Sequence, residues 1–313
     1  MRPIALMMPG QGSQFVGMGR ELAEAASAAR ELYERADDVL DLPISRISWE
    51  GPDEELTRTE NAQPAILLHS FAAWTVLSPE VRGAVLVGAG HSLGEFTAYL
   101  AAGALGFDDA LRLVRRRGEL MARSGDERPG TMAAILGMDP DPLRELCEAC
   151  STRDSVVVPA NYNAPGQIVV SGDVAAVERA CEAAPGAGAR KAIPLNVSGA
   201  FHSPLMETAR DGLAAALAGV RVGDADFPVI SNASARPVVV VADAREGLVR
   251  QLTSPVRWVE SVSAMRERKP AAWLELGPGK VLCGLLKRID RNQVGLAAGE
   301  PAEIERLLET LHA

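Results

Sequence analysis

The sequence predicts an α/β fold in two parts: a larger unit built on a buried parallel sheet, and a smaller α+β unit inserted into it. Of the 313 residues, 47% are apolar and 23% are charged, as in ordinary globular proteins, but only 4% are aromatic. Short, wholly apolar runs such as 4–8 and 85–87 precede segments with helical periodicity. A run of this kind is typical of a central strand in a parallel sheet, which helices cover on both faces.

Composition also argues against several classes of protein. The net charge is −9, from 32 basic and 41 acidic residues. An acidic chain with so few aromatic residues is not expected to bind nucleic acid. No apolar run reaches the roughly 18 residues that a membrane span requires. The apolar start of the chain is interrupted by Pro9-Gly10 before a signal-peptide core forms. We therefore expect a cytoplasmic protein, and a monomer.

The most informative stretch covers residues 84–104. A predicted strand at 85–87 is followed by Gly-His-Ser-Leu-Gly at 90–94 and then by apolar residues at helical spacing. This order is the context of a nucleophile elbow, which holds a serine hydroxyl at the end of a strand beside the first amides of a helix. It makes Ser92 the candidate nucleophile and the larger unit α/β-hydrolase-like. The alternatives are an ordinary Gly-rich turn, or a dinucleotide-binding loop in which Leu93 stands where the third glycine is required.

Two more residues stand in breaks beside predicted elements. Gln11 follows the first strand in a Gly-rich turn, at the kind of strand end where α/β folds place ligand sites, although turn chemistry also accounts for it. The chain has four histidines: His69, His91, His202 and His312. We expect the first on a long amphipathic helix and the last at the C-terminus. Only His202 stands in a loop away from the elbow, where a general base is commonly held, with a capping role as the alternative.

A predicted helix from Asp108, its expected cap, to about Arg123 carries a buried cation. Four apolar residues share one face of this helix by their spacing: Leu113, Val114, Leu120 and Met121. Arg117 falls in the middle of that face. Because a guanidinium cannot be buried unpaired without a large cost, Arg117 requires an anionic partner, and an internal carboxylate is the simplest one.

A different unit begins after the polar break at 126–130. Strands are predicted at 132–136, 156–158, 167–171 and 190–195, and helices at 142–150 and 174–184. This β-α-β-β-α-β order is typical of a ferredoxin-like unit. We place the small unit at 128–196 and the large unit at 1–127 and 197–313.

Other predictions concern helices of the large unit and the cysteines. We expect a helix from Asn61 to Leu77 with Pro64 in its first turn, and a helix at 247–252. A last helix is expected to bury Val281, Leu285 and Leu286 and to expose Lys280, Lys287 and Arg288. Cys147 and Cys150 form a Cys-x-x-Cys without a second pair or a nearby histidine, so we expect no metal or redox site.

Taken together, the motifs resemble one family, the malonyl-CoA:acyl carrier protein transacylases of fatty acid and polyketide synthesis. The likeness covers essentially the whole chain. Its motifs are Pro9-Gly-Gln-Gly-Ser-Gln14, Gln63-Pro-Ala65, Gly90-His-Ser-Leu-Gly-Glu95, Arg117-Gly118, Asn161-Tyr-Asn163, Gly199-Ala-Phe-His-Ser203, Gln251 with Ser254-Pro-Val-Arg-Trp258, and Glu275-Leu-Gly-Pro-Gly279.

The resemblance implies a role for each matching residue. Ser92 would be acylated with His202 as its base, and the backbone carbonyl of Gln251 would orient that base. The amides of Gln11 and Leu93 would form the oxyanion hole. Two further sets are implied. The malonyl carboxylate would bind Arg117, within a substrate pocket that includes Gln63, His91, Met121, Asn161, Asn163 and Phe201. Phe201 and Leu93 resemble the malonyl-selective rather than the methylmalonyl-selective forms.

The implied reaction transfers a malonyl group from malonyl-CoA to the phosphopantetheine thiol of an acyl carrier protein, with ping-pong kinetics. It needs no metal and no bound cofactor. Two alternatives remain open, an acyl hydrolase of acyl-carrier proteins and a carrier-binding scaffold with a vestigial site. For carrier docking the sequence offers a basic rim, with a solvated face as the alternative. Its members are Arg190, Lys191, Lys280, Lys287 and Arg288.

Overall fold

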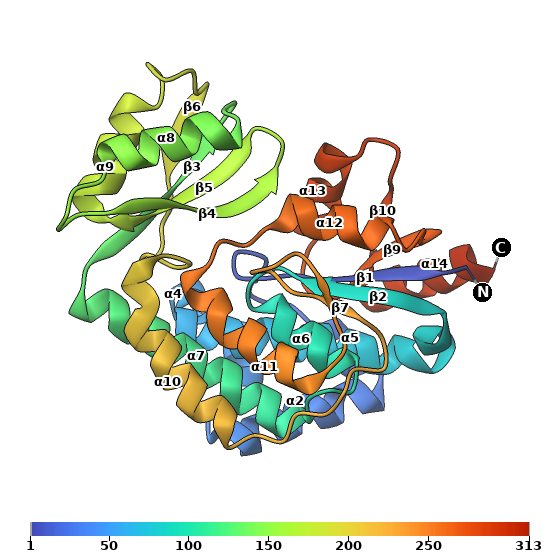
Figure 1. Cartoon of the computed structure of the whole chain (residues 1–313). Coiled ribbons are helices and arrows are strands. Elements are labelled where there is room, and N and C mark those ends of the chain that lie inside the picture. The colour runs from blue at the N-terminus through green and yellow to red at the C-terminus, as the bar shows by residue number, and fades with distance from the viewer. Residues whose placement is uncertain (1, 313) are drawn as a thin grey trace.

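The computed structural model describes residues 2–312, without the side chain of His312, as a mixed α/β protein with two separate sheets (Figure 1). The larger sheet has six strands in the order β10-β9-β1-β2-β7-β8, parallel except at β8. Its strands are β1 (Ile4–Met8), β2 (Val85–Gly90), β7 (Val229–Ile230), β8 (Pro237–Val238), β9 (Ala272–Glu275) and β10 (Gly295–Ala297).

The first strand is central, as its apolar run predicts. It pairs in parallel with β2 on one side and with β9 on the other. Alternate residues point to opposite faces of a strand, and here both faces are buried. Ile4, Leu6 and Met8 pack into the main core, while Ala5 and Met7 pack into a second core on the other face of the sheet.

Helices cover both faces of this sheet. α5 (Thr59–Val81), α6 (Gly94–Ala101) and α7 (Phe107–Glu127) contribute to the main core, and α12 (Trp258–Arg266) and α13 (Val281–Ile289) to the second. The other helices of this unit are α1 (Arg20–Ala25), α2 (Ser27–Leu40), α3 (Ile44–Glu50), α4 (Asp53–Thr57), α10 (Glu207–Ala218), α11 (Val241–Arg250) and α14 (Pro301–His312). Short 3₁₀ turns lie at Arg82–Ala84, Pro204–Met206 and Gln251–Thr253.

The smaller sheet stands above the larger unit in Figure 1, drawn in green to yellow. Its strands are β3 (Gly130–Leu136), β4 (Val157–Ala164), β5 (Gln167–Asp173) and β6 (Lys191–Pro194), joined by α8 (Pro140–Cys150) and α9 (Val174–Ala183). They pair antiparallel in the order β4-β5-β3-β6, and α8 and α9 bury one face around a core of their own. The predicted β-α-β-β-α-β element order is therefore present.

Two helices begin elsewhere than predicted. α5 starts at Thr59, not Asn61, so Pro64 lies inside the helix and not in its first turn. α5 is buried on nearly every side and is therefore not amphipathic, because other helices and the sheet surround it. Gly106, not Asp108, caps α7, and Asp108 instead accepts a hydrogen bond from Arg35.

Two further predictions in the C-terminal part are wrong. α11 spans Val241–Arg250 instead of 247–252, so Gln251 opens a separate 3₁₀ turn. Val281 is the first residue of α13, and its side chain is 49% exposed and points away from the core. Leu282 takes its buried place together with Leu285 and Leu286, as expected for residues three and four apart on a helix.

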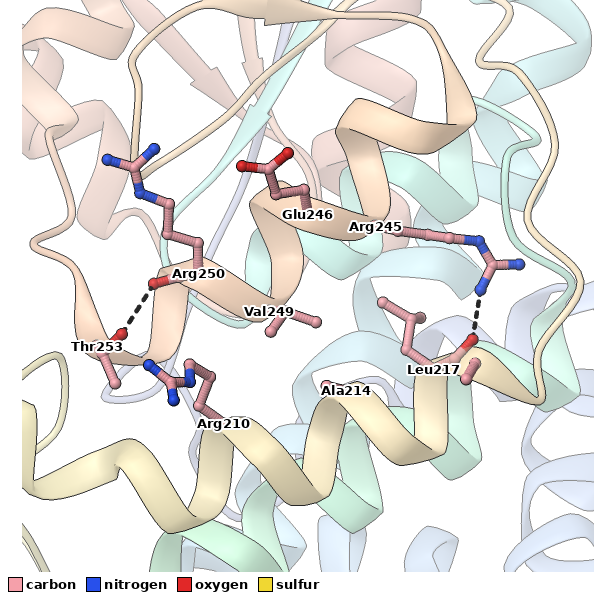
Figure 2. Close-up of a pocket in the computed structure, with 9 residues that line it drawn as sticks. Arg210, Ala214, Leu217, Arg245, Glu246, Val249, Arg250 and Thr253 are labelled. Carbon is pink, nitrogen blue, oxygen red and sulfur yellow. Dashed lines mark hydrogen bonds between the residues drawn. The ribbon is translucent and has the colours of Figure 1, made fainter.

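Within the described residues, no helix has both the length and the apolar character needed to cross a membrane. A surface groove of about 500 Å³ lies between α10 and α11 (Figure 2). One of its arginines, Arg245, donates to the carbonyls of Leu217 and Val220 and so caps the C-terminal end of α10. This groove contains none of the predicted site residues.

Candidate active site

The turn between β2 and α6 holds Ser92 in a strained conformation. Its φ is +51°, in the left-handed region that non-glycine residues rarely adopt. The flanking glycines are required by close packing of the backbone. A Cβ on Gly90 would lie 1.9 Å from the carbonyl carbon of Gly94, and a Cβ on Gly94 would lie 2.1 Å from the carbonyl oxygen of Met8. The Gly-x-Ser-x-Gly spacing therefore lets the start of α6 pack directly against β1 and β2.

Ser92, His202 and Gln251 form a hydrogen-bonded chain. The Ser92 Oγ lies 2.7 Å from His202 Nε2, and His202 Nδ1 lies 2.9 Å from the backbone oxygen of Gln251. A carbonyl can only accept, so Nδ1 carries the proton and Nε2 is free to accept the serine proton. Burial, followed by the charge of Arg117, lowers the pKa of His202 to about 3. The imidazole is therefore neutral at ordinary pH, as a general base must be.

Arg117 lies at the nucleophile and is only 1% exposed. Its guanidinium donates to Gln63 Oε1 at 2.8 Å, to Ser92 Oγ at 3.0 Å and to Gln251 Oε1 at 2.9 Å. Among the described residues it forms no ion pair with a carboxylate, so the internal salt bridge that the sequence left open as an alternative is not present. Burial lowers the pKa of Arg117 to about 10, which leaves it charged at neutral pH. A buried cation held by neutral oxygens can bind an anion from outside.

The amides of Gln11 and Leu93 belong to two adjacent strand ends. β1 and β2 are parallel neighbours with Met8 opposite Gly90, so the loops that follow them meet at one edge of the sheet. Within residues 2–312 neither amide donates to a protein acceptor. Both can therefore donate to an oxyanion formed beside Ser92, while the Gln11 side chain is held on Thr59 Oγ1 at 3.1 Å.

A cavity of about 330 Å³ opens at Ser92. Ten of the predicted site residues line it: Gln11, His91, Ser92, Leu93, Arg117, Met121, Asn161, Asn163, Phe201 and His202. Outside the basic rim, the two remaining predicted residues are Gln63 and Gln251, which accept hydrogen bonds from Arg117. Gln63 also donates to Met121 Sδ at 3.4 Å. Asn163 of β4 contacts His91 Nε2 at 2.8 Å, so the small sheet forms one wall of the cavity.

Sequence reasoning missed two buried residues that support this site. Asn232 accepts from the Ser92 amide and donates to the Gly90 carbonyl, both at 2.7 Å, and so holds the elbow from its two sides. Glu95 accepts from Gln251 Nε2 at 2.6 Å and from the Asn232 amide at 3.1 Å. One available signal was the position of Asn232 just beyond β7, at a strand end. The other was a carboxylate on the otherwise uncharged α6.

The five residues of the basic rim are exposed and lie outside this cavity. Lys191 pairs with Leu136, which pairs with Gln167, and Arg288 donates to the Gln167 side chain. The basic residues of β6 and of α13 therefore lie near the same end of the small sheet.

A comparison with protein families finds a match over most of the chain. The model of the family described as "Acyl transferase domain" matches residues 6–299. The chain belongs to the acyl transferase domain family. This acyl transferase is 46% identical to the malonyl CoA-acyl carrier protein transacylase of Bacillus subtilis strain 168, over 99% of this chain and 98% of that protein.

Solved structures agree closely with this acyl transferase. One is a malonyl-transacylase in complex with the acyl-carrier protein of a type II PKS, 40% identical, with a TM-score of 0.94 over 98% of this chain and 99% of that one. Another is the acyl-carrier-protein-S-malonyltransferase of Bartonella henselae, 39% identical, with a TM-score of 0.95 over 99% and 100% of the two chains. The family that the sequence motifs resemble is thus confirmed, and so is a mixed α/β fold with a parallel-containing sheet and a separate antiparallel sheet.

Proposed function

We propose that this acyl transferase moves a malonyl group from malonyl-CoA to the phosphopantetheine thiol of an acyl carrier protein, through malonyl-Ser92. The relatives that carry this activity by name match over nearly the full length of the chain. One observation supports the proposal above all others. The buried Arg117 guanidinium lies 3.0 Å from the Ser92 Oγ, and no carboxylate of the described residues pairs with it.

In the first half-reaction, Ser92 Oγ attacks the thioester carbon of malonyl-CoA while His202 Nε2 takes the hydroxyl proton. The carbonyl oxygen becomes an oxyanion, which the amides of Gln11 and Leu93 stabilise. The carbon–sulfur bond then breaks, and the leaving coenzyme A sulfur takes the proton from His202. This step leaves malonyl-Ser92, with its carboxylate on the Arg117 fork.

The second half-reaction runs the same steps in reverse with a new thiol. The carrier phosphopantetheine thiol gives its proton to His202, and its sulfur attacks the ester carbon of malonyl-Ser92. When the carbon–oxygen bond breaks, His202 returns the proton to Ser92 Oγ. Because one base serves both half-reactions and coenzyme A leaves first, the kinetics are ping-pong.

Several other assignments belong to the same proposal. The larger unit is α/β-hydrolase-like, supported by the β2–Ser92–α6 elbow, and it comprises 1–127 and 197–313, with a ferredoxin-like unit at 128–196. The enzyme works as a cytoplasmic monomer. Each step above has its reacting group in Ser92, His202 or a backbone amide, so the proposed reaction calls for no bound cofactor.

Intact-mass spectrometry tests the proposal directly. Brief exposure to malonyl-CoA should add one malonyl group to the wild-type chain and none to Ser92→Ala, and the added group should pass to a phosphopantetheinylated carrier. Acyl hydrolysis, the rival activity, would instead release malonate at the same rate without a carrier. A chain that never acquires a malonyl group would leave only the carrier-binding scaffold.

A further inference from the structure

A second buried ionisable group lies beside the site, the carboxylate of Glu95. Glu95 is fully buried on α6, and the reaction proposed above does not use it. Its Oε2 accepts two hydrogen bonds, from Gln251 Nε2 and from the Asn232 amide. Its Oε1 faces the Ser231 side chain but makes no hydrogen bond of normal length within the described residues. A buried carboxylate with an unpaired oxygen is costly, so its retention beside the site calls for an explanation.

The Gln251 side chain connects Glu95 to Arg117. Its Oε1 accepts from Arg117 Nη2 at 2.9 Å, while its Nε2 donates to Glu95 Oε2 at 2.6 Å and to the Ser92 carbonyl at 2.9 Å. Because Arg117 can only donate and the Glu95 carboxylate can only accept, the side-chain amide of Gln251 has a single orientation that satisfies both. The backbone oxygen of the same residue holds His202 Nδ1.

The charges of Glu95 and Arg117 act on each other through Gln251. Arg117 and Glu95 are both fully buried charged groups, and a single amide separates them. Two unit charges separated by one side chain interact strongly in the interior of a protein, where the dielectric constant is low. The carboxylate of Glu95 therefore offsets part of the Arg117 charge and opposes a second carboxylate arriving at the same guanidinium.

We propose that Glu95 is a positioning residue that holds Gln251 and, through its negative charge, weakens the attraction of Arg117 for the malonyl carboxylate so that the malonyl group can leave Ser92. This inference rests on the proposed function. A transfer enzyme must release what it binds, and a cation without a counter-charge would retain the malonyl-enzyme.

The substitution Glu95→Gln separates charge from shape. The amide oxygen can replace Oε2 as the acceptor for Gln251 and Asn232, and the new NH₂ faces the side of Ser231, whose Oγ also lacks a partner within residues 2–312. A control for neutralising a buried carboxylate elsewhere is Glu275→Gln, because Glu275 is also fully buried but accepts hydrogen bonds from the backbone amides of Leu282 and Cys283 at the start of α13. Since its new NH₂ would face one of these N–H donors, thermal unfolding checks that this variant is folded.

Intact-mass spectrometry measures the rate of Ser92 acylation by malonyl-CoA and by acetyl-CoA. The quantity compared is the malonyl-to-acetyl ratio, the first rate divided by the second. Burial raises the pKa of Glu95 to about 7, so the assay is run at about pH 8.5, where the carboxylate is ionised. Glu95→Gln should raise the ratio roughly tenfold, the order expected for one unit charge a few ångströms away, and should slow malonyl transfer to the carrier. Glu275→Gln should leave the ratio unchanged.

A double variant shows whether the effect passes through Arg117. In an Arg117→Ala background, Glu95→Gln should no longer change the malonyl-to-acetyl ratio. The inference is overturned if Glu95→Gln leaves the ratio unchanged or lowers it, or if the change persists without Arg117. Those outcomes differ from a failure of the proposed function, in which the wild-type chain itself would not acquire a malonyl group.

Discussion

Arg117 Nη2 donates to Ser92 Oγ at 3.0 Å, so the buried cation touches the candidate nucleophile itself. The same nitrogen donates to Gln251 Oε1, and Nη1 donates to Gln63. A malonyl ester on Ser92 would carry its carboxylate only three atoms beyond Oγ. The site is therefore suited to a short acyl group that ends in an anion.

Arg117→Ala should reduce malonyl transfer by roughly 30-fold to several thousandfold, because losing one partner of a buried charge pair costs about 2–5 kcal/mol. Acetyl transfer should fall little or rise, since the cavity becomes neutral. Arg117→Lys should recover only part of the malonyl activity, because an ammonium lacks the planar fork. Rates with malonyl-CoA and acetyl-CoA decide the point. A retained preference for malonyl-CoA would mean that another group holds the carboxylate.

His202→Ala should slow acylation of Ser92 by roughly 10²–10⁴-fold, the usual contribution of a positioned proton acceptor. In the wild type, the pKa of His202 lies near 3, mainly through burial. A neutral base is active above its pKa, so the rate of Ser92 acylation by acetyl-CoA should stay constant as the pH is lowered from 8 to about 5. In particular, it should not decrease near pH 6.5, the approximate pKa of an unperturbed histidine. Stopped-flow or quenched-flow acylation measures this profile. A loss of less than tenfold in His202→Ala would assign the base elsewhere.

Charge reversal on the basic rim should weaken carrier docking. Lys191→Glu on β6 and Lys287→Glu on α13 are suitable changes, because both side chains are exposed and lie outside the cavity. The KM for the carrier should rise, more strongly at low salt, while the KM for malonyl-CoA stays unchanged. A control is Lys269→Glu, an exposed lysine beyond α12. Equal effects on both substrates would identify the rim as an ordinary solvated face.

Gly94→Ala should destabilise the fold by about 1–3 kcal/mol, because the new Cβ would lie 2.1 Å from the Met8 carbonyl and the backbone must shift. Acylation of Ser92 should fall as well, since the elbow would move. Gly284→Ala is the control, because its Cβ would meet nothing within 4 Å and alanine favours a helix by up to about 1 kcal/mol. Thermal unfolding of both variants gives the comparison. A Gly94→Ala chain as stable as the wild type would contradict the packing argument.

The sequence by itself was sufficient for features that depend on local pattern. The apolar run 4–8 predicted a central strand, and the structure confirms it because both faces of β1 are buried. The Gly-x-Ser-x-Gly turn, the loop position of His202 and the buried place of Arg117 were also readable, because each depends on residues close in sequence. Errors arose where the pattern was weak. Val281 was predicted to be buried because it is apolar, but apolarity alone does not determine which way the first residue of a helix points.

Only the tertiary structure decided which distant residues meet at Ser92. Parallel pairing of β1 and β2 brings the loops of Gln11 and Leu93 together, and the packing of α5 against α7 brings Gln63 to Arg117. The sequence indicated that Arg117 requires an anion, either an internal carboxylate or, by the resemblance, the malonyl carboxylate. It could not show that the side-chain amide of Gln251 lies between Arg117 and Glu95. Hydrogen-bond partners across such separations follow from chain topology and side-chain packing. A local pattern shows that a buried charge needs a partner, but the three-dimensional arrangement selects it.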